Sequence, residues 1–574
     1  MKKINIFCKT IALIIALASV LSIFASCQKE PQNNEEEPKN LLDISGYTIV
    51  RYDNAKVKVT KKTTALKNAI KEKIGLDLAV TEDWYNPNTP PDPNAKEILI
   101  DKTNRKESQD ALAKLESKEG DAFIVEITEN KIVLAGKTDL STIRAISYFI
   151  NNYVLPSAQA NTIDISGGSS EIRDYSAEKN IWITNKLDMD VEFTTTLISS
   201  SNKKTNALGY PTNITQVYFP SVIELQHQPK EENNGTLIAA VSIGEDPGIS
   251  TIGCIMESRD GGKNWDVIAR PEETVDTRLW AGQMAHIYEL PAQVGNLPAG
   301  TLIYAANAVN YEYKSHIGVW RSFDCGKTWK EISIVASAGG LGEGVWEPVM
   351  FYEESDGYLY CFYSDDSDPD HDQKIVYKRS KNGVRWEKAV EVFASENPAD
   401  RPGMPVITKM GNGEYFLVYE YCNSWMGDVQ DCFIYYKTTK DITNWNSSDP
   451  GTRISAKVNG NDYTMASSPC CVWTPAGGEN GTLFLQGRRQ FGDLSIRTFV
   501  SFDYGKTWDT IETPIPYDWY SCVIDGVDQA IGYRPIMTLG ADPSIIHFVT
   551  ITDVKDIKKS QLQYAKLKVY YMYD

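Results

Sequence analysis

The sequence predicts a mainly β protein, a six-bladed β-propeller preceded by a small α+β domain. Three observations lead to this prediction. From about residue 185 to residue 574, short segments rich in Val, Ile, Tyr and Phe alternate with turns, as in β-rich folds. A phrase of eight residues recurs in that part at a nearly constant interval. Residues 42–170 instead mix helical and strand periodicities, which indicates a separate α+β domain.

The recurring phrase begins at positions 258, 322, 380, 438 and 501, so the intervals are 64, 58, 58 and 63 residues. A repeat of this length is typical of repeat architectures. The Asp and Gly positions favour a tight turn, and the final Trp is suited to burial between neighbouring repeats. Three near-perfect copies read SRDGGKNW, SFDCGKTW and SFDYGKTW, a shortened form reads SKNGVRW, and a degenerate form reads TTKDITNW.

This phrase resembles the Asp-box, or sialidase-type repeat, which marks propeller blades and has a structural role. Five marked blades and one unmarked blade give six, at about four strands each. We expect the unmarked blade to combine both ends of the repeat region. The strand-like segment 567–573 (LKVYYMY) is the candidate that closes the ring.

The first 27 residues have the features of a bacterial lipoprotein signal peptide. Lys2 and Lys3 precede an apolar run over 11–24, and Ala-Ser-Cys follows at 25–27. The resemblance to a lipobox implies that Cys27 carries lipid and that the exported chain is anchored to the outer membrane. Residues 28–41 are polar and acidic and predict a flexible linker.

The α+β domain is predicted element by element. Leu66, Ile70 and Ile74 share one helical face, which Gly75 ends. The stretch 121–150 resembles the non-catalytic α/β domain that precedes the catalytic domain of hexosaminidases and glucuronidases, and it holds no chemical constellation. The expected elements are strands at 47–52 and 97–100, helices at 63–74, 109–115 and 139–153, and a hairpin of 122–127 with 131–135.

Composition excludes some functions. The net charge of −18 argues against nucleic acid and anionic membrane surfaces as partners, whereas a neutral glycan is compatible with it. Neither the cysteines nor the five histidines show a metal-ligand spacing, and no cofactor motif occurs, so we expect no metal and no cofactor. In an exported chain Cys422 and Cys432 can close a loop, although spacing does not determine pairing.

Two glutamates stand out as candidates for chemistry. Glu347 lies in GVWEPVM (344–350), and Glu420 lies near the end of the apolar run YFLVYEY (415–421). A carboxylate in such surroundings is costly to bury unless it is paired or used. The alternative is a structural glutamate that accepts backbone N–H groups.

Four motifs around these glutamates, in this order, resemble glycoside hydrolase family 93, the exo-acting α-1,5-L-arabinanases. They are WEP (346–348), YSDD (363–366) with QKIVYKRS (373–380), RPGMP (401–405) and YE (419–420). The resemblance implies a retaining mechanism with Glu347 as general acid/base and Glu420 as nucleophile. Retaining carboxyl pairs lie about 5–5.5 Å apart. Glu347 then needs a raised pKa, and Glu420 needs hydrogen-bond donors that keep it ionised.

Further site residues follow from the same resemblance. Tyr533 matches a late position at which a tyrosine supports the nucleophile, although GYRP (532–535) departs from the expected YSR. Each remaining candidate has a structural alternative: blade core for the aromatic residues, a loop cap for the aspartate and a structural role for the arginines. These candidates for substrate binding are Trp346, Tyr363, Asp365, Arg401 and Arg534.

Two other functions stay open. A sialidase shares the repeats, but it binds a carboxylate through three arginines, the first in an Arg-Ile-Pro phrase. The corresponding place reads VYFPS (217–221), without arginine. The second alternative is a glycan-binding surface lipoprotein without catalysis, since propellers often serve as scaffolds.

Overall fold

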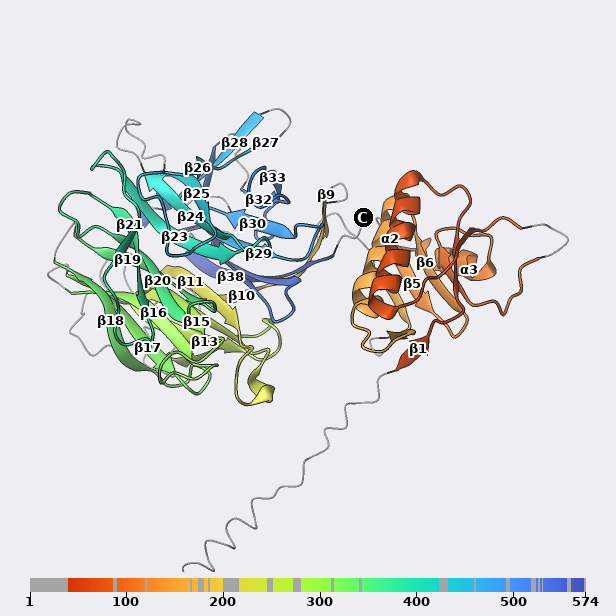
Figure 1. The fold of residues 1–574 in the computed structure, drawn as a ribbon, viewed down its shortest axis with the longest axis horizontal. Coiled ribbons are helices and arrows are strands. Elements are labelled where there is room, and N and C mark those ends of the chain that lie inside the picture. Colours follow the sequence, from red (N-terminus) through yellow and green to blue (C-terminus); the bar gives the residue numbers. More distant parts are fainter. Residues whose placement is uncertain are drawn as a thin grey trace, which may run out of the picture.

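The computed structural model describes most of the chain after residue 39 (Figure 1). The predicted lipoprotein signal peptide with Cys27, and residues 28–39 of the predicted linker, lie outside the described residues. The described ranges are 40–85, 90–118, 122–165, 168–173, 180–183, 186–199, 216–244, 251–271, 280–310, 314–339, 343–422, 432–458, 461–491, 496–517, 523–524, 527–528, 530–554 and 559–571.

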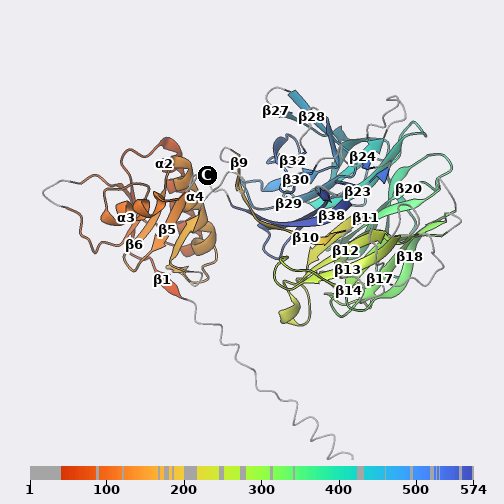
Figure 2. The ribbon, with the colours of Figure 1, turned by 180° about the vertical axis from the view of Figure 1, so that it is seen from behind.

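The N-terminal domain is a mixed sheet with helices packed on it, and it lies beside the ring of sheets in Figures 1 and 2. Its strand order is β3-β2-β4-β6-β5-β8, in which β2, β3, β4 and β6 run parallel and β5 pairs antiparallel with both neighbours. A separate β1–β7 pair joins its ends. The strands are β1 (Leu41–Asp43), β2 (Thr48–Arg51), β3 (Val80–Glu82), β4 (Glu97–Ile100), β5 (Phe123–Ile127), β6 (Lys131–Gly136), β7 (Thr162–Asp164) and β8 (Ser170–Arg173).

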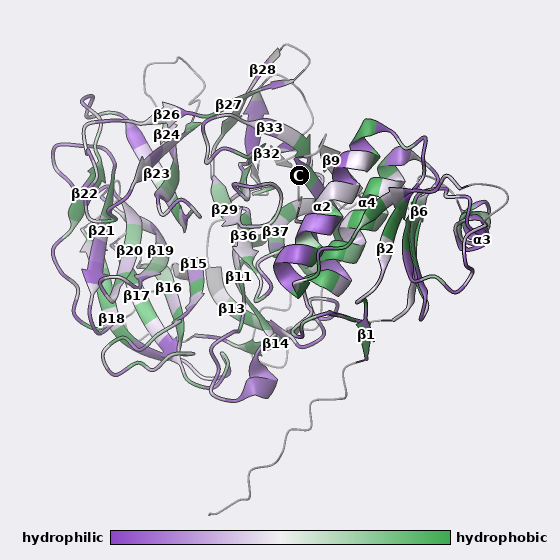
Figure 3. Ribbon diagram, turned by 45° about the vertical axis from the view of Figure 1, so that its right-hand side comes forward, coloured by the Kyte–Doolittle hydropathy of each residue, from purple (hydrophilic) through white to green (hydrophobic). Residues whose placement is uncertain are grey.

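The helices here are α2 (Val57–Ile74), α3 (Lys106–Leu115) and α4 (Asp139–Phe149), which η1 (Ile150–Val154) continues as a π-helical turn. α2 ends at Gly75, whose φ of 85° is left-handed, as the sequence predicts. α2 begins at Val57, before the predicted start at residue 63. The sequence did not predict this boundary, because the N-cap residue Lys56 makes no side-chain capping hydrogen bond. In Figure 3, α2 shows green and purple surfaces, since one face packs on the sheet and the other meets solvent.

Within the described residues, the C-terminal part forms six antiparallel runs of four strands. They are, in chain order from the innermost strand, β11 (Gln216–Glu224), β12 (Leu237–Gly244), β13 (Thr251–Ser258), β14 (Asp266–Ala269); β15 (Trp280–Glu289), β16 (Leu302–Val309), β17 (Ser315–Ser322), β18 (Lys330–Ala338); β19 (Val345–Glu353), β20 (Tyr358–Asp365), β21 (Lys374–Ser380), β22 (Val390–Phe393); β23 (Arg401–Lys409), β24 (Tyr415–Cys422), β25 (Phe433–Thr439), β26 (Thr452–Arg453); β29 (Cys470–Thr474), β30 (Thr482–Gln486), β32 (Arg497–Ser501), β33 (Asp509–Glu512); and β36 (Ile536–Leu539), β37 (Ile545–Val554), β38 (Lys559–Val569), β10 (Leu187–Ser199).

The smaller elements decorate these sheets. β31 and β27 pair with β28, which itself pairs with β25, and β9 pairs with β10. They are β9 (Asn180–Ile183), η3 (Glu231–Asn233), β27 (Ser455–Val458), β28 (Asn461–Ala466), β31 (Arg489–Phe491), β34 (Val523–Ile524) and β35 (Val527–Asp528).

The first strands of these runs contact one another in a closed cycle, β11, β15, β19, β23, β29, β36 and back to β11. Apolar clusters fill the space between neighbouring sheets: Val319 of one sheet packs in a cluster with Met350 of the next, and Phe362 with Phe416. Each fully buried aromatic side chain of this kind contributes about 1.5–3 kcal/mol. The cycle closes through β10, which pairs with β38, so both ends of the repeat region share one sheet.

The recurring phrase forms the turn that its residues predict. Ser322 Oγ donates to Asp324 Oδ1 at 2.8 Å, Thr328 N donates to the same oxygen at 2.9 Å, and Trp329 Nε1 donates to Gly326 O at 2.8 Å. The tryptophans reach neighbouring sheets, since Trp265 packs edge-on against Tyr564 of β38 with ring centroids 5.5 Å apart. The tryptophan that ends each of these turns thus helps to join neighbouring sheets.

The mainly β class with a propeller-like ring of small sheets is therefore confirmed. Among the helices of the described residues, none combines the length and the apolar character needed to cross a bilayer.

Candidate active site

A left-handed residue occurs in, or two residues before, the innermost strand of each of the six runs. Register shifts occur at these places in β11, β15, β19 and β23, which marks β-bulges. Proline follows at five of the six, and a residue without an N–H group suits a point where ladder bonding is interrupted. The six residues, with φ between 45° and 54°, are Phe219, Met284, Glu347, Met404, Ser468 and Arg534.

Glu347 is one of these six residues, with a φ of 52°. The bulge between Trp346 and Val349 removes its amide from the ladder, and Asn307 Oδ1 on β16 accepts that N–H at 3.0 Å. The Asn307 amide also donates to Val345 O. A non-glycine residue in this region costs about 1–3 kcal/mol and persists where its surroundings fix it, commonly at functional sites. The fold thus directs this glutamate out of the regular strand.

Glu347 is 8% exposed, and the pKa of its carboxyl group is raised to about 7. Burial is the largest cause, and the negative charges of Glu420 and Asp366 add to it. Ser364 Oγ, which donates to Oε2 at 2.7 Å, and the nearby Arg534 act in the opposite direction. A carboxyl group with this pKa is suited to hold and release a proton near neutral pH.

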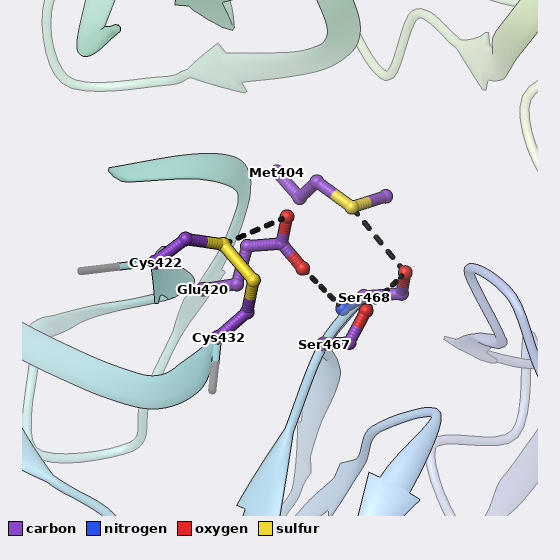
Figure 4. The surroundings of a disulfide bond; sticks show 6 residues. All are labelled: Met404, Glu420, Cys422, Cys432, Ser467 and Ser468. Atoms are coloured by element: carbon purple, nitrogen blue, oxygen red, sulfur yellow. Dashed lines mark hydrogen bonds between the residues drawn. A yellow bond between two sulfur atoms is a disulfide. The ribbon is translucent and has the colours of Figure 1, made fainter. Parts of the chain in front are cut away.

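Glu420 lies in the regular strand β24 and is partly exposed. Burial raises its pKa, while the Ser468 amide, the Ser467 side chain and the charges of Arg489 and Arg488 favour its ionised form. Ser468 N donates to Oε2 at 2.8 Å, as Figure 4 shows. Glu420 therefore has the donors that a nucleophilic carboxylate needs.

Tyr533 and Arg534 come to the same place from the segment before β36. The pKa of the Tyr533 phenol is raised, first by burial and then by the charges of Glu420 and Glu347. The Arg488 guanidinium lies 4.8 Å from the centroid of the Tyr533 ring. Tyr533 is thus near enough to both glutamates for their charges to act on it.

Arg534 joins sheets that are not neighbours in the ring. It donates through Nη1 to Met284 O at 2.7 Å and through Nη2 to Pro348 O at 3.1 Å. Its own pKa is lowered by burial to about 10, so it stays charged at neutral pH. Non-neighbouring sheets of a closed cycle meet only at its centre, so Glu347, which precedes Pro348, lies near the axis, where the charge of Glu420 acts on it.

Trp346, Asp366 and Arg401 form a second group next to Glu347. Asp366 Oδ2 accepts from Trp346 Nε1 at 3.0 Å and from Arg401 Nη2 at 2.8 Å, and Gln373 donates to Oδ1 at 2.7 Å. The pKa of Asp366 is raised, chiefly by burial. Arg401 thus binds the buried Asp366 carboxylate, and Trp346 is partly exposed.

Three substrate-binding predictions need correction. Tyr363 is 1% exposed and packs in the apolar cluster between two sheets, so its ring cannot stack on substrate. Asp365 caps the turn after β20 by accepting from Ser367 N at 2.9 Å, and its neighbour Asp366 makes the central contacts. Arg534 donates from both terminal nitrogens to backbone carbonyls of two other sheets, so the contacts seen in the structure are those of a positioning residue.

The sequence reading did not assign roles to Asn307, Ser364, Ser468 and Arg488. A signal was present for one of them: residue–Pro pairs recur at 219, 347, 404, 468 and 534, and each marks a left-handed residue. Asn307 and Ser364 have no such signal, because they act across strands.

The predicted loop closure is present, as Cys422 and Cys432 form a disulfide. Among the described residues these two sulfurs and a Glu420 oxygen lie within 4.8 Å of one another. Disulfide sulfurs are not thiolates, so this trio does not fit a metal ion.

Comparisons with known proteins agree with this geometry. The model of the BNR repeat-like domain matches residues 300–516. A solved α-L-arabinofuranosidase of Fusarium graminearum, complexed with an iminosugar inhibitor, is 27% identical, with a TM-score of 0.52 over 62% of this chain and 95% of that chain. Penicillium chrysogenum α-L-arabinanase, complexed with arabinobiose, is 26% identical, with a TM-score of 0.53 over 65% and 97%.

These likenesses support a glycoside hydrolase. A further structure, the family 93 α-L-arabinofuranosidase of Fusarium graminearum with arabinobiose, is 26% identical, with a TM-score of 0.52 over 65% of the present chain and 98% of that chain. The search of curated proteins found no match to the present chain. Nearly the whole length of each of these three solved chains is matched.

Proposed function

We propose that the protein is an exo-acting, retaining glycoside hydrolase that cleaves a neutral plant polysaccharide, α-1,5-linked L-arabinan. The observation that carries the proposal is the pair of glutamates near the ring axis, with Glu347 buried at a pKa of about 7 and Glu420 supplied with donors. The arabinan-directed names of the similar solved structures support the choice of substrate.

The proposed reaction has two steps. Glu420 attacks the anomeric carbon while Glu347 gives its proton to the departing glycosidic oxygen, which leaves an arabinosyl ester on Glu420. Glu347 then removes a proton from water, and that water displaces Glu420 with net retention. Tyr533 and the Ser468 amide stabilise Glu420 as its charge changes, and Asp366 with Arg401 fixes Trp346 beside the sugar.

The test is to incubate the protein separately with linear α-1,5-arabinan and with a sialylated oligosaccharide. We expect short products released from the ends of arabinan, with the anomer observed by NMR retaining its configuration, and Glu347→Gln and Glu420→Gln should each abolish release. Cleavage of the sialylated substrate alone would establish a sialidase. Binding to arabinan without cleavage would establish the non-catalytic reading, and near-normal turnover by both variants would refute the assigned roles.

We also propose that the ring has six blades. Six antiparallel runs and six matching left-handed residues among the described residues support this number. An experimental structure that placed five or seven runs around the axis would contradict it.

We propose further that the protein is exported and lipid-anchored to the outer membrane through Cys27. The basic, apolar and small-residue segments before Cys27 support this proposal. Metabolic labelling with a radioactive fatty acid should label the wild type and not Cys27→Ser. Equal labelling of both proteins would contradict lipidation at Cys27.

A further inference from the structure

The Cys422–Cys432 disulfide lies beside the proposed nucleophile. In the β24–β25 pair, Tyr421 lies opposite Phe433, so Cys422 and Cys432 face each other at the next position. Side chains two residues apart share one face of a strand, and Glu420 and Cys422 accordingly lie together. The distance from Cys422 Sγ to Glu420 Oε1 is 3.9 Å (Figure 4).

The disulfide also connects to the main donor of Glu420. Ser467 N donates to Cys432 O at 2.7 Å, and the next amide, Ser468 N, donates to Glu420 Oε2 at 2.8 Å. The contacts form a closed circuit from Glu420 to Cys422, across the disulfide to Cys432, on to Ser467 and Ser468, and back to Glu420. The β24 backbone between Glu420 and Cys422, the disulfide, and the hydrogen bonds of Ser467 N and Ser468 N together restrain the distance between the carboxylate and the amide.

The serine segment needs such restraint. Ser467 and Ser468 are both left-handed, with φ of 64° and 50°, a conformation that non-glycine residues adopt only when their surroundings fix it. Ser468 Oγ donates to Met404 Sδ at 3.3 Å, and Arg488 N donates to Ser467 O at 2.8 Å. The Cys432 carbonyl ties this segment to the β24–β25 hairpin, together with the Ser468 N–Glu420 bond and the pairing of Ala466 with Phe433.

We propose that the Cys422–Cys432 disulfide is a positioning element of the active site, which holds the Glu420 carboxylate against the Ser468 amide. The proposal rests on the proposed function for its kinetic consequences. The effect of the disulfide on the position of the Glu420 carboxylate does not depend on which substrate the protein cleaves.

The first measurement uses the folded wild type before and after treatment with a phosphine, which reduces the disulfide to two thiols while the phosphine becomes its oxide. On linear α-1,5-arabinan we expect kcat to fall about ten- to hundredfold, since misplacement by about 1 Å can cost that much, with KM changed less than about threefold. Reoxidation should restore kcat. The Cys422→Ser/Cys432→Ser double variant should resemble the reduced wild type and should not respond to the phosphine, which is the matched control.

The second measurement separates positioning from general loss of structure. The charged and titratable groups that interact electrostatically with the Glu420 carboxyl group are Arg488, Arg489, Tyr533 and Glu347. Loss of the Ser468 donor removes support for the ionised form, so the acidic limb of kcat/KM should move to higher pH. A lower fraction of folded protein would reduce the rate without moving this limb.

Carboxyl 13C NMR titration, with Glu420→Gln to assign the resonance, reports the Glu420 pKa without any substrate. An upward shift on reduction supports the proposal even if arabinan is not cleaved, in which case only the proposed function fails. An unchanged Glu420 titration after complete reduction overturns the proposal, even if arabinan is cleaved. If the double variant does not fold, the Glu420 pKa is compared by the same NMR titration in the oxidised and the reduced wild type.

Discussion

The two glutamates of the site lie in regions of different construction. Glu347 lies on a left-handed bulge and is 8% exposed, and the neutral Ser364 hydroxyl donates a hydrogen bond to its carboxyl group. Glu420 lies in a regular strand, partly exposed, with a backbone amide, a serine side chain and two arginine charges supporting it. Identical side chains thus meet opposite demands.

The difference teaches how one ring supplies both an acid and a nucleophile. Burial raises the pKa of Glu347 more than the Ser364 hydroxyl and the Arg534 charge lower it, so the protonated form is favoured. The negative charge of Glu420 raises this pKa further. Burial also raises the pKa of Glu420, but the donors and arginine charges around it oppose that rise and favour its ionised form. Coupled groups whose environments push their pKa values apart are the usual basis of such a division of roles.

The largest effect should come from removing each carboxyl group and comparing leaving groups. Glu420→Ala should lower kcat/KM by on the order of 10⁴-fold or more on arabinan and on an activated aryl arabinoside alike. Glu347→Ala should cost about 10²–10⁴-fold on arabinan and far less on the aryl glycoside, whose leaving group needs no proton. Equal sensitivity of both variants to the leaving group would break the comparison.

The next effect is on pH dependence. The active form has Glu347 protonated, so kcat/KM should fall as pH rises through about 7. Asp366→Asn removes a negative charge that raises the Glu347 pKa, and the alkaline limb should therefore move to lower pH. Asp365→Asn is the matched control, because Asp365 caps a turn and should leave the limb in place. A limb that moves equally in both variants would contradict the assignment.

A third effect concerns stability. Folding raises the Glu347 pKa, so the folded state binds more protons than the unfolded state between about pH 4.5 and 7, and stability contributed by this group is lost as pH rises through that window. Glu347→Gln should thus raise the free energy of unfolding by about 3 kcal/mol at pH 8 and by little at pH 4. Denaturant unfolding at both pH values measures this difference. A gain of the same size at pH 4 would point to packing instead.

The smallest effect distinguishes the two aromatic candidates. Tyr363→Phe should leave KM for arabinan within about twofold, because the ring lies in the core. Trp346→Phe, which loses the indole bond to Asp366, should raise KM more. A larger rise of KM in Tyr363→Phe would restore the stacking role that the structure removes.

Much of the fold could be predicted from local patterns. The strand at 97–100 and the end of α2 at Gly75 agree with the residues expected, since alternation, helical faces and a glycine stop act over a few residues. The start of α2 could not be predicted, because no capping side chain marks Lys56. The ring could be predicted because its period is long and its turn chemistry is specific.

By itself, the sequence determined the repeat, the turns and the two candidate glutamates, because periodicity and residue type depend on neighbours along the chain. Only the tertiary structure decided that Tyr363 faces a core, that Asp366 rather than Asp365 binds Arg401, and that Ser468 supports Glu420. The physical reason is that strand orientation and bulges rotate each side chain, and a contact between different sheets depends on how those sheets pack. The protonation of Glu347 likewise depends on burial and charge from several sheets.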